Sequence, residues 1–296
     1  MNTLDYLFYN KVLSNGSTPT TESLKSIVEK SLPFQKQVLT VDSSLTTSKY
    51  KARNEITEVT ITKATSGTNV FRDCLLLEKA IFEKATSIGS GCFENCFNLT
   101  DVTGSLVTTI NDNAFENCLY LKNVNTPSVT KTGIATFRNC ISLENLNLEN
   151  LTTVGRECFY NCVSLNYINL TNVTELGSDT FYNCYSLGIG NNEPDLYSIT
   201  KIGASCFYNC TGLKRLQLGT FSNNVTSIGT KAFYNCTNLE ELWIISSTLP
   251  TISSDTFQGT KFERGEGSIL MREELIPEAQ ADSRWSAYSS IIGPLP

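Results

Sequence analysis

Eleven cysteines are the residues of this sequence that could most readily do chemistry. Three of them, Cys92, Cys158 and Cys206, lie directly before the phenylalanine of a repeated sequence motif, which is described below. Other copies of the motif have Ala or Thr at this position. Thiols can form disulfides, bind metals or act as nucleophiles, and buried thiols can also simply fill space. The other eight recur at a regular spacing, and they are Cys74, Cys96, Cys118, Cys140, Cys162, Cys184, Cys210 and Cys236.

The sequence favours the space-filling role. It contains no His, the commonest base for a cysteine nucleophile and the usual partner of Cys in mixed metal sites. Equivalent cysteines on stacked coils would lie about 4.8 Å apart with parallel side chains, whereas a disulfide needs Cβ atoms roughly 3.5–4.5 Å apart that face each other. We therefore expect no metal and no catalytic residues, and disulfides between some of the cysteines stay open at this stage.

The elements that position these cysteines are copies of one motif, Phe-x-Asn-Cys-x-x-Leu. Successive copies are 22 residues apart as far as Phe181, and the next steps are 26, 26 and 24 residues. No single copy can bury its Phe and Leu alone, so this short period predicts a solenoid in which stacked coils share one core. The copies begin at Phe71, Phe93, Phe115, Phe137, Phe159, Phe181, Phe207 and Phe233, with a degenerate copy at Phe257.

Each copy also contains a predicted strand. The pattern Leu-x-x-Leu-x-Leu follows the cysteine, as at Leu143, Leu146 and Leu148, and its alternation indicates a strand with one buried face. Equivalent strands of successive coils would pair in parallel. The extra residues of the two 26-residue steps fall at 188–198 and 219–224, and we expect them to bulge from the solenoid as loops.

The combination Thr-x-Ile-Gly-x-x-Ala/Cys-Phe-x-Asn-Cys-x-x-Leu-x-x-Leu resembles the BspA-like, or Treponema-type, leucine-rich repeat over residues 56–262. The resemblance implies a right-handed solenoid of the α/β class, with a parallel sheet on one face and short turns or helical pieces on the other. Its length corresponds to about nine coils of 22–26 residues. Residues 263–296 are similar to the closing segment of such proteins and are expected to form a C-terminal cap.

Residues 1–55 do not fit the period. The segment ESLKSIVEKSL, which follows Thr20 and Thr21, has the pattern of a capped amphipathic helix. We interpret residues 1–55 as a partly helical N-terminal cap or an attachment segment.

Two rows of strand residues are expected to face solvent. One row contains Tyr167, Arg215 and Glu241, and the other contains four successive asparagines followed by Gln217 and Trp243. The asparagines could form an external amide ladder or offer hydrogen bonds to a partner. Tyr, Arg and Trp are the types that anchor interfaces, although Trp243 could instead pack against the C-terminal cap. The candidate partner-binding residues are Asn147, Tyr167, Asn169, Arg215, Glu241 and Trp243.

Two further expectations concern neighbouring positions. The Asn that precedes each repeated Cys is expected to satisfy backbone groups of its own and the adjoining coil. If Trp243 is exposed, the same strand phase would also expose Ile245.

Composition narrows the possible partners. The chain has 23 basic and 29 acidic residues, a formal net charge of −6 and no basic run, which argues against nucleic acid and anionic membranes. No run of about 18 apolar residues is present, so we expect no membrane insertion. The first residues lack the features of a secretory signal.

The family resemblance implies a non-enzymatic binding or adhesion protein at the cell surface or secreted, without a cofactor. Its partner would be a host or matrix protein, or a glycan, recognised along the extended sheet face. The alternative is a structural or assembly component, such as part of a surface array or virus-particle appendage, with residues 1–55 as the docking piece.

Overall fold

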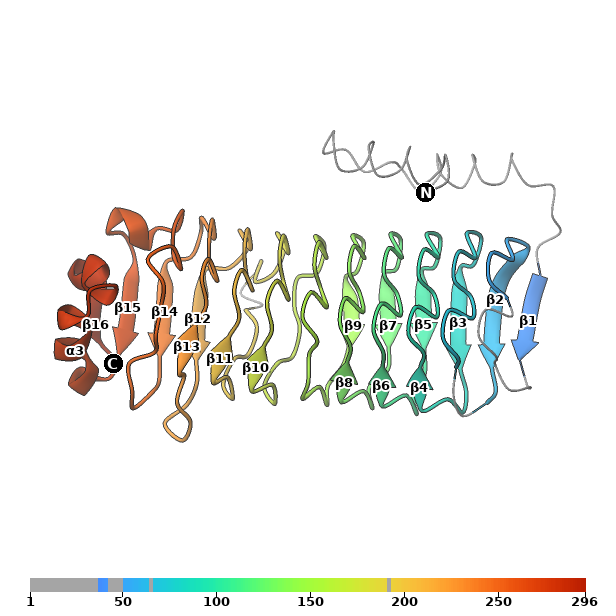
Figure 1. Cartoon of the computed structure of the whole chain (residues 1–296), viewed down its shortest axis with the longest axis horizontal. Coiled ribbons are helices and arrows are strands. Elements are labelled where there is room, and N and C mark those ends of the chain that lie inside the picture. The colour runs from blue at the N-terminus through green and yellow to red at the C-terminus, as the bar shows by residue number, and fades with distance from the viewer. Residues whose placement is uncertain (1–36, 42–49, 64–65, 191–192) are drawn as a thin grey trace.

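The computed structural model describes residues 37–41, 50–63, 66–190 and 193–296. These residues form one elongated spiral of coils, with the C-terminal helices at one end (Figure 1). The parallel solenoid predicted from the repeat is confirmed. The helix expected within residues 20–32 lies outside the described residues. Within the described ranges, no helix reaches the length and apolar character that crossing a bilayer requires.

The long side of the spiral is a parallel sheet in two parts. The first part pairs strands β1 (Gln37–Val41), β2 (Ile56–Ile61), β3 (Lys79–Phe82), β5 (Asp101–Thr103), β7 (Asn123–Asn125) and β9 (Asn145–Asn147). The second part pairs β12 (Arg215–Leu218), β14 (Glu241–Ile244), β15 (Ser268–Met271) and β16 (Ile292–Pro294). The boundaries of the repeat region at residues 55 and 262 stay predictions, although paired strands continue on both sides of them.

Two narrow sheets line another edge of the coils. One consists of β4 (Ser87–Ile88), β6 (Thr109–Ile110) and β8 (Lys131–Thr132), and the other of β10 (Glu175–Leu176), β11 (Lys201–Ile202) and β13 (Ser227–Ile228). Their second residues are all buried, so these two-residue strands close the core. Tight turns rather than helices connect them to the next long strand.

The core contains an unbroken column of aromatic rings. Consecutive rings from Tyr50 to Phe257 are stacked, with centroids 5.3–5.6 Å apart. All the repeated phenylalanines are fully buried, as the sequence predicts. Tyr50 begins the column because it occupies the Phe position of an earlier coil, one step of 21 residues before Phe71.

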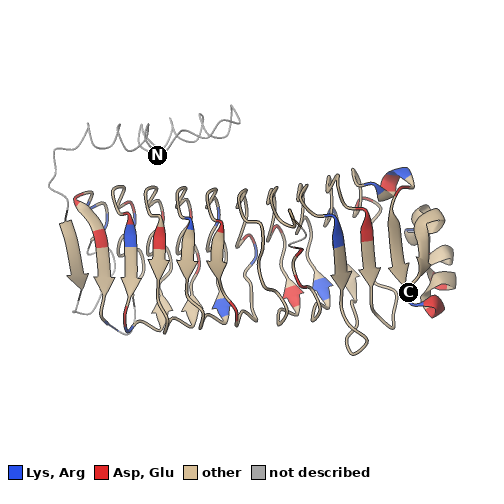
Figure 2. Ribbon diagram, turned by 180° about the vertical axis from the view of Figure 1, so that it is seen from behind, with Lys and Arg blue, Asp and Glu red and all other residues tan. Residues whose placement is uncertain are grey.

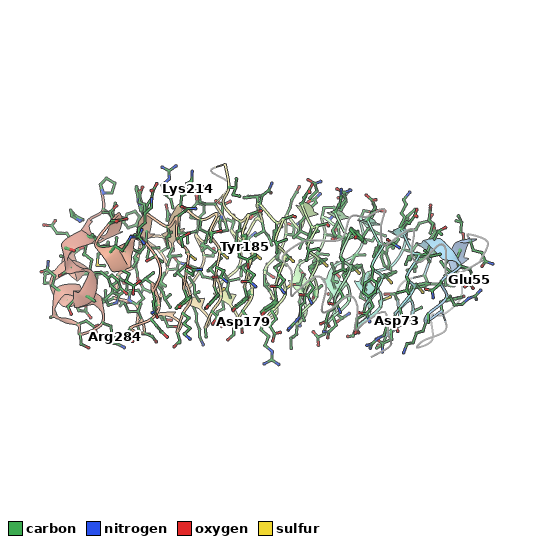
Figure 3. All side chains as sticks on the ribbon, turned by 90° about the horizontal axis from the view of Figure 1, so that it is seen from above. Glu55, Asp73, Asp179, Tyr185, Lys214 and Arg284 are labelled. Carbon is green, nitrogen blue, oxygen red and sulfur yellow. The ribbon has the colours of Figure 1, made fainter. Side chains whose placement is uncertain are left out.

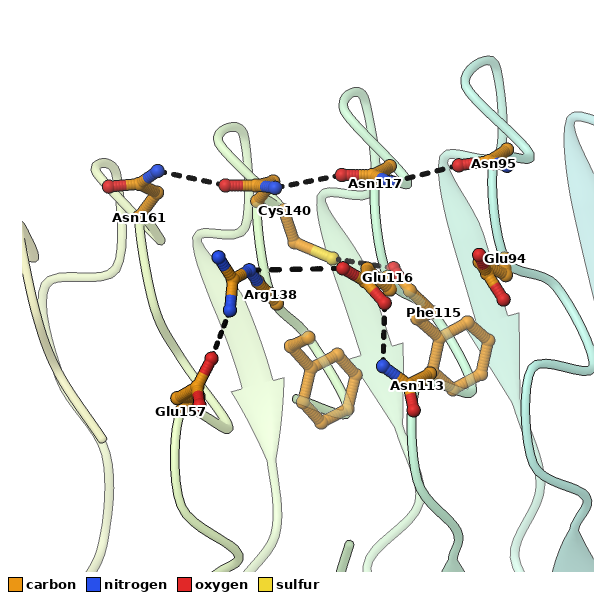
Figure 4. A network of polar contacts seen from close by, with 12 residues as sticks. Glu94, Asn95, Asn113, Phe115, Glu116, Asn117, Arg138, Cys140, Glu157 and Asn161 are labelled. Atoms are coloured by element: carbon orange, nitrogen blue, oxygen red, sulfur yellow. Dashed lines mark hydrogen bonds and ion pairs between the residues drawn. The ribbon is translucent and has the colours of Figure 1, made fainter. Parts of the chain in front are cut away.

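The asparagine before each repeated cysteine has two roles. Its backbone is left-handed, with φ between 58° and 64° in all seven copies, a conformation that Asn tolerates better than most residues. Its side-chain Nδ2 donates to Oδ1 of the preceding copy at 2.7–2.8 Å, from Asn235 back to Asn95 and then to Asp73. Figure 4 shows the part of this ladder between Asn161 and Asn95. The expected hydrogen bonds to the backbone are thus replaced by a side-chain ladder.

The eleven cysteines are free and buried in the structure, as a space-filling role requires. The eight at the repeated position also act as donors. Each Sγ lies 3.0–3.2 Å from the carbonyl oxygen of the aromatic residue one coil earlier, as Cys140 does to Phe115 (Figure 4). The thiol therefore supplies a weak hydrogen bond at a buried carbonyl.

A second aromatic stack runs along the outside. The rings of Tyr160, Tyr182, Tyr208 and Tyr234 are stacked with centroids 4.5–4.7 Å apart, and the Arg138 guanidinium lies 4.6 Å from the first ring. Asp179, whose carbonyl accepts a hydrogen bond from the Tyr182 amide, lies on the opposite edge of the solenoid from Lys214, which precedes β12 (Figure 3). The four tyrosines belong to the turns that contain the repeated phenylalanines, and none of them is part of a strand of the long sheet.

The C-terminal segment closes the core. It contains η1 (Phe262–Arg264), η2 (Glu273–Leu275), α3 (Ile276–Ala281) and η3 (Trp285–Ile291), interleaved with the last two strands. Trp285, Tyr288 and Phe262 all pack around Phe257, the last ring of the column.

Candidate binding site on the sheet face

The long sheet presents the two predicted rows of side chains in register. Asp101, Asn123 and Asn145 are direct partners on neighbouring strands, and further along Arg215 pairs with Glu241 and Gln217 with Trp243. The intervening residues of each strand are buried or nearly so, as in the alternation of Arg215–Leu218. The predicted inward and outward phases are therefore confirmed for these strands.

The first half of the face is occupied by amides that bond to one another. Asn123 donates to Asp101 at 2.7 Å, Asn145 donates to Asn123 at 2.8 Å, and Asn147 donates to Asn125 at 3.0 Å. The ladder interpretation of the asparagine row is thus confirmed between Asn125 and Asn147. Most of this polar surface is already engaged.

The second half of the face is different in shape and composition. The sheet pairing is interrupted between β9 and β12, where the 26-residue step inserts extra residues. Tyr167 and Ile189, which continue the outward row here, are 38% and 54% exposed. The smooth amide surface therefore gives way to exposed apolar side chains.

A depression of about 390 Å³ lies beside this interruption. Its size falls within the range of small-ligand sites, roughly 300–1,000 Å³. Residues 193–197, the part of the first insertion that is called the inserted loop below, form one wall, and strands β12 and β14 form the rest. It is lined by Glu193, Pro194, Asp195, Tyr197, Arg215, Leu216, Gln217, Glu241 and Trp243.

Hydrogen bonds fix several of the lining side chains. The Tyr167 hydroxyl donates to Asp195 Oδ2 at 3.1 Å, which ties the sheet row to the inserted loop. The Trp243 indole Nε1–H donates to Glu241 Oε1 on the same strand. Partial burial and the nearby Asp195 carboxylate raise the pKa of both Tyr167 and Tyr197, so these phenols stay protonated donors at neutral pH.

Two charged groups in the depression have unused bonding capacity. Arg215 lies opposite Glu241 in the sheet, on neighbouring strands of opposite charge (Figure 2), but forms no ion pair with a described residue. Glu193 Oε1 is shielded from solvent and has no hydrogen-bond partner in the described part of the chain. A ligand could therefore gain hydrogen bonds from Arg215 without displacing an internal ion pair, whereas the shielded Oε1 of Glu193 is not accessible to it.

The structure brings together four of the six predicted partner-binding residues, Arg215, Glu241 and Trp243 in the lining and Tyr167 at its edge. The other two lie elsewhere. Asn147 belongs to the amide ladder, and Asn169 Oδ1 accepts a hydrogen bond from the Thr171 amide at 3.0 Å.

Trp243 is partly buried, lies on the open face and pairs in register with Leu270 of β15. Trp243 therefore meets both expectations, because it lies on the open face and also contacts a C-terminal strand. The expectation that Ile245 is exposed is wrong, because this residue follows the end of β14 and is only 7% exposed.

Sequence reasoning missed the wall supplied by Glu193, Asp195 and Tyr197. The available signal was the first 26-residue step, since extra residues in a solenoid coil have to leave the regular spiral. Their side chains could not be placed over the sheet from the period alone.

The cysteines offer no reactive group. Burial raises the pKa of all eleven thiols, for example to about 12 for Cys92 and Cys158, so they remain protonated. Among the residues that the structure describes, no three His, Cys, Asp or Glu side chains are grouped so that they could hold a metal ion.

Comparison with known proteins identifies the repeat. The family model described as a BspA type leucine-rich repeat region matches in six copies, over residues 3–118, 64–188 and 194–266. A leucine-rich repeat protein from Bacteroides ovatus has a TM-score of 0.54 at 20% identity, and the match covers 88% of this chain and 66% of that one. The T. pallidum leucine-rich repeat protein has a TM-score of 0.47 at 22% identity, with 52% and 77% covered. A search of curated proteins returned no match.

The family match extends over far more than half of the sequence, and the B. ovatus structure shares the fold. Both agree with the stacked parallel coils described above. The chain is a right-handed leucine-rich-repeat solenoid and belongs to the BspA-type leucine-rich-repeat family.

Proposed function

We propose that the chain is a non-enzymatic binding protein, of the secreted or cell-surface adhesion type, and that it recognises a protein or glycan through the C-terminal half of its sheet face. The observation that carries this proposal is the depression between the inserted loop and strands β12 and β14. It combines the aromatic side chains of Trp243 and Tyr197 with the exposed guanidinium of Arg215, which forms no ion pair with a described residue.

The contrast along the sheet supports this location. In the N-terminal half, the outward amides hydrogen-bond to one another, so a partner would have to break existing bonds to engage them. In the C-terminal half, Tyr167, Ile189 and Tyr197 are exposed apolar surface. Aromatic residues and Arg dominate the binding energy of interfaces because they combine large area with polar tips.

Two features support binding rather than catalysis. The thiols are protonated and buried, so none is poised as a nucleophile. The family fold also presents its side chains on an extended, shallow surface, which suits recognition of a large partner.

The test is a binding array of matrix proteins and glycans, probed with the intact chain and with the triple variant Tyr167→Ala/Arg215→Ala/Trp243→Ala. The matched control is Glu175→Ala/Lys201→Ala, which alters two exposed cross-strand partners on the narrow sheet. We expect the triple variant to lose the interaction and the control to keep it. An interaction that survives the triple change would contradict the proposal.

A further inference from the structure

The chemistry of the depression discriminates between classes of partner. Its charged lining is mixed, with the three carboxylates of Glu193, Asp195 and Glu241 around the single guanidinium of Arg215. An anion would be repelled by the net negative charge of this lining. A cation would be attracted by the carboxylates but would also meet the guanidinium of Arg215, so a cation is the alternative that the experiment below has to exclude.

The lining also offers hydrogen-bonding groups of both kinds. The exposed guanidinium of Arg215 offers donors and forms no ion pair with any described residue, and the carboxylates of Asp195 and Glu241 offer acceptors. A hydroxyl group can accept from the guanidinium and donate to a carboxylate. A ligand with several hydroxyl groups would therefore engage both kinds of group at once.

The aromatic residues complete the pattern. Trp243 is held by its hydrogen bond to Glu241, and Tyr197 on the inserted loop is 39% exposed. Both line the same depression, so they offer apolar rings beside the polar groups. A sugar ring has an apolar face of C–H groups and a rim of hydroxyls, which matches apolar rings flanked by donors and acceptors.

From this combination we infer that the depression is a subsite for a neutral sugar, so that the partner is a neutral glycan or a protein that carries one. This inference rests on the proposed function and narrows its partner. The sugar ring packs on Trp243 or Tyr197, its hydroxyls donate to Asp195 and Glu241, and Arg215 donates to a hydroxyl or ring oxygen.

The inference is tested with the intact chain and four soluble probes, measured by saturation-transfer NMR and calorimetric titration. The neutral probes are chitotriose and mannotriose, and the charged ones are 3′-sialyllactose and trilysine. We expect a neutral probe to bind, and Trp243→Ala to weaken it by about tenfold or more. Trp243→Phe, which keeps an aromatic ring and much of the volume, should retain part of the affinity and controls for misfolding.

Arg215→Ala should change the affinity for a neutral sugar and the affinity for a cation in opposite directions. The exposed Arg215 side chain can be removed with little effect on folding, and its loss should weaken a neutral sugar that accepts its hydrogen bond. The same change should strengthen a cation, because it removes a repelling charge from beside three carboxylates. Preferential binding of trilysine, strengthened by Arg215→Ala, would overturn the sugar assignment.

The array described above distinguishes the two levels of failure. If the triple variant loses a protein partner but no neutral probe binds the parent chain, the sugar inference fails while the sheet-face function stands. If the partner is retained by the triple variant and no probe binds, both fail. If a neutral probe binds and neither Trp243→Ala nor Arg215→Ala changes its affinity, the inference is also overturned.

Discussion

The indole of Trp285 lies against the ring of Phe257, with centroids 6.1 Å apart, and its Nε1–H donates to the carbonyl oxygen of Pro250 at 2.8 Å. Phe257 is the last ring of the internal column, so Trp285 covers what would otherwise be an exposed aromatic face. Both side chains are fully buried. A solenoid has no neighbour beyond its last coil, and this contact shows how the C-terminal segment supplies one.

We predict that Trp285→Ala lowers the free energy of unfolding by about 3–5 kcal/mol, the range for emptying a large buried aromatic site. Trp285→Phe should cost less, because it keeps a ring against Phe257 and loses only the bond to Pro250. Urea denaturation followed by circular dichroism measures both. Equal losses for the two variants would show that aromatic packing is not what closes the column.

Inward and outward positions should differ strongly in their contribution to stability. Phe159→Ala removes a fully buried ring that stacks on Phe137 and Phe181, and should cost about 3–5 kcal/mol. Tyr167→Ala should cost far less, because Tyr167 is 38% exposed on the sheet face. The two unfolding midpoints in urea provide the comparison. Equal shifts would contradict the assignment of these side chains to core and surface.

The asparagine ladder makes a separate prediction at Asn139. Its backbone φ is 61°, and its side chain bonds to both Asn117 and Asn161 at 2.8 Å. Asn139→Gly loses the bonds but accepts the left-handed backbone, whereas Asn139→Ala loses the bonds and also suffers about 1–2 kcal/mol of backbone strain. Thermal or urea unfolding should therefore show that the Asn139→Gly variant is more stable than the Asn139→Ala variant. The reverse order would mean that backbone conformation does not select Asn here.

Buried thiols should make the fold sensitive to alkali. Burial raises the pKa of Cys158 from 9.0 to about 12, so the folded state holds the proton more tightly than the unfolded state does. The resulting stabilisation is complete below pH 9 and is lost as the pH rises from 9 towards 12, by at most about 1.4 kcal/mol per pH unit for each thiol. Urea unfolding at a series of pH values measures the slope.

The matched variant for this prediction is Cys158→Ala, since Ala occupies the same position in two other copies as Ala114 and Ala232. The free energy of unfolding of this variant should fall less steeply between pH 9 and 12 than that of the parent chain, because one buried thiol no longer contributes to the slope. Rapid reaction of the folded protein with Ellman's reagent at neutral pH would contradict the burial of the thiols.

The sequence allowed the core to be predicted because its repeat is nearly exact in the residues that pack. Each coil repeats Phe, Cys and Leu at positions that contact the same positions of the next coil, so one assignment fixed many others. Tyr50 was missed because its coil has Tyr in place of Phe and Arg53 in place of Cys. The stacking of the coils tolerates Tyr at the Phe position, although this substitution makes the motif hard to detect in the sequence.

The candidate site was harder to predict because half of it is not repeated. The sheet rows placed Arg215, Glu241 and Trp243 correctly on one face. The wall containing Asp195 and Tyr197 comes from an insertion, whose path depends on contacts such as that between Tyr167 and Asp195 and not on a period. The same period predicted Asn169 on this face, but its side-chain oxygen accepts a hydrogen bond from the Thr171 amide in its own turn.

Tryptophan fluorescence can show whether the bound partner lies against Trp243. The chain has only two tryptophans, so Trp285→Phe leaves Trp243 as the sole indole reporter. We expect its fluorescence to change on titration with the partner identified by the array, at the same concentrations that saturate binding. A partner that binds with full affinity and leaves the Trp243 emission unchanged would contradict the placement of the site on this face.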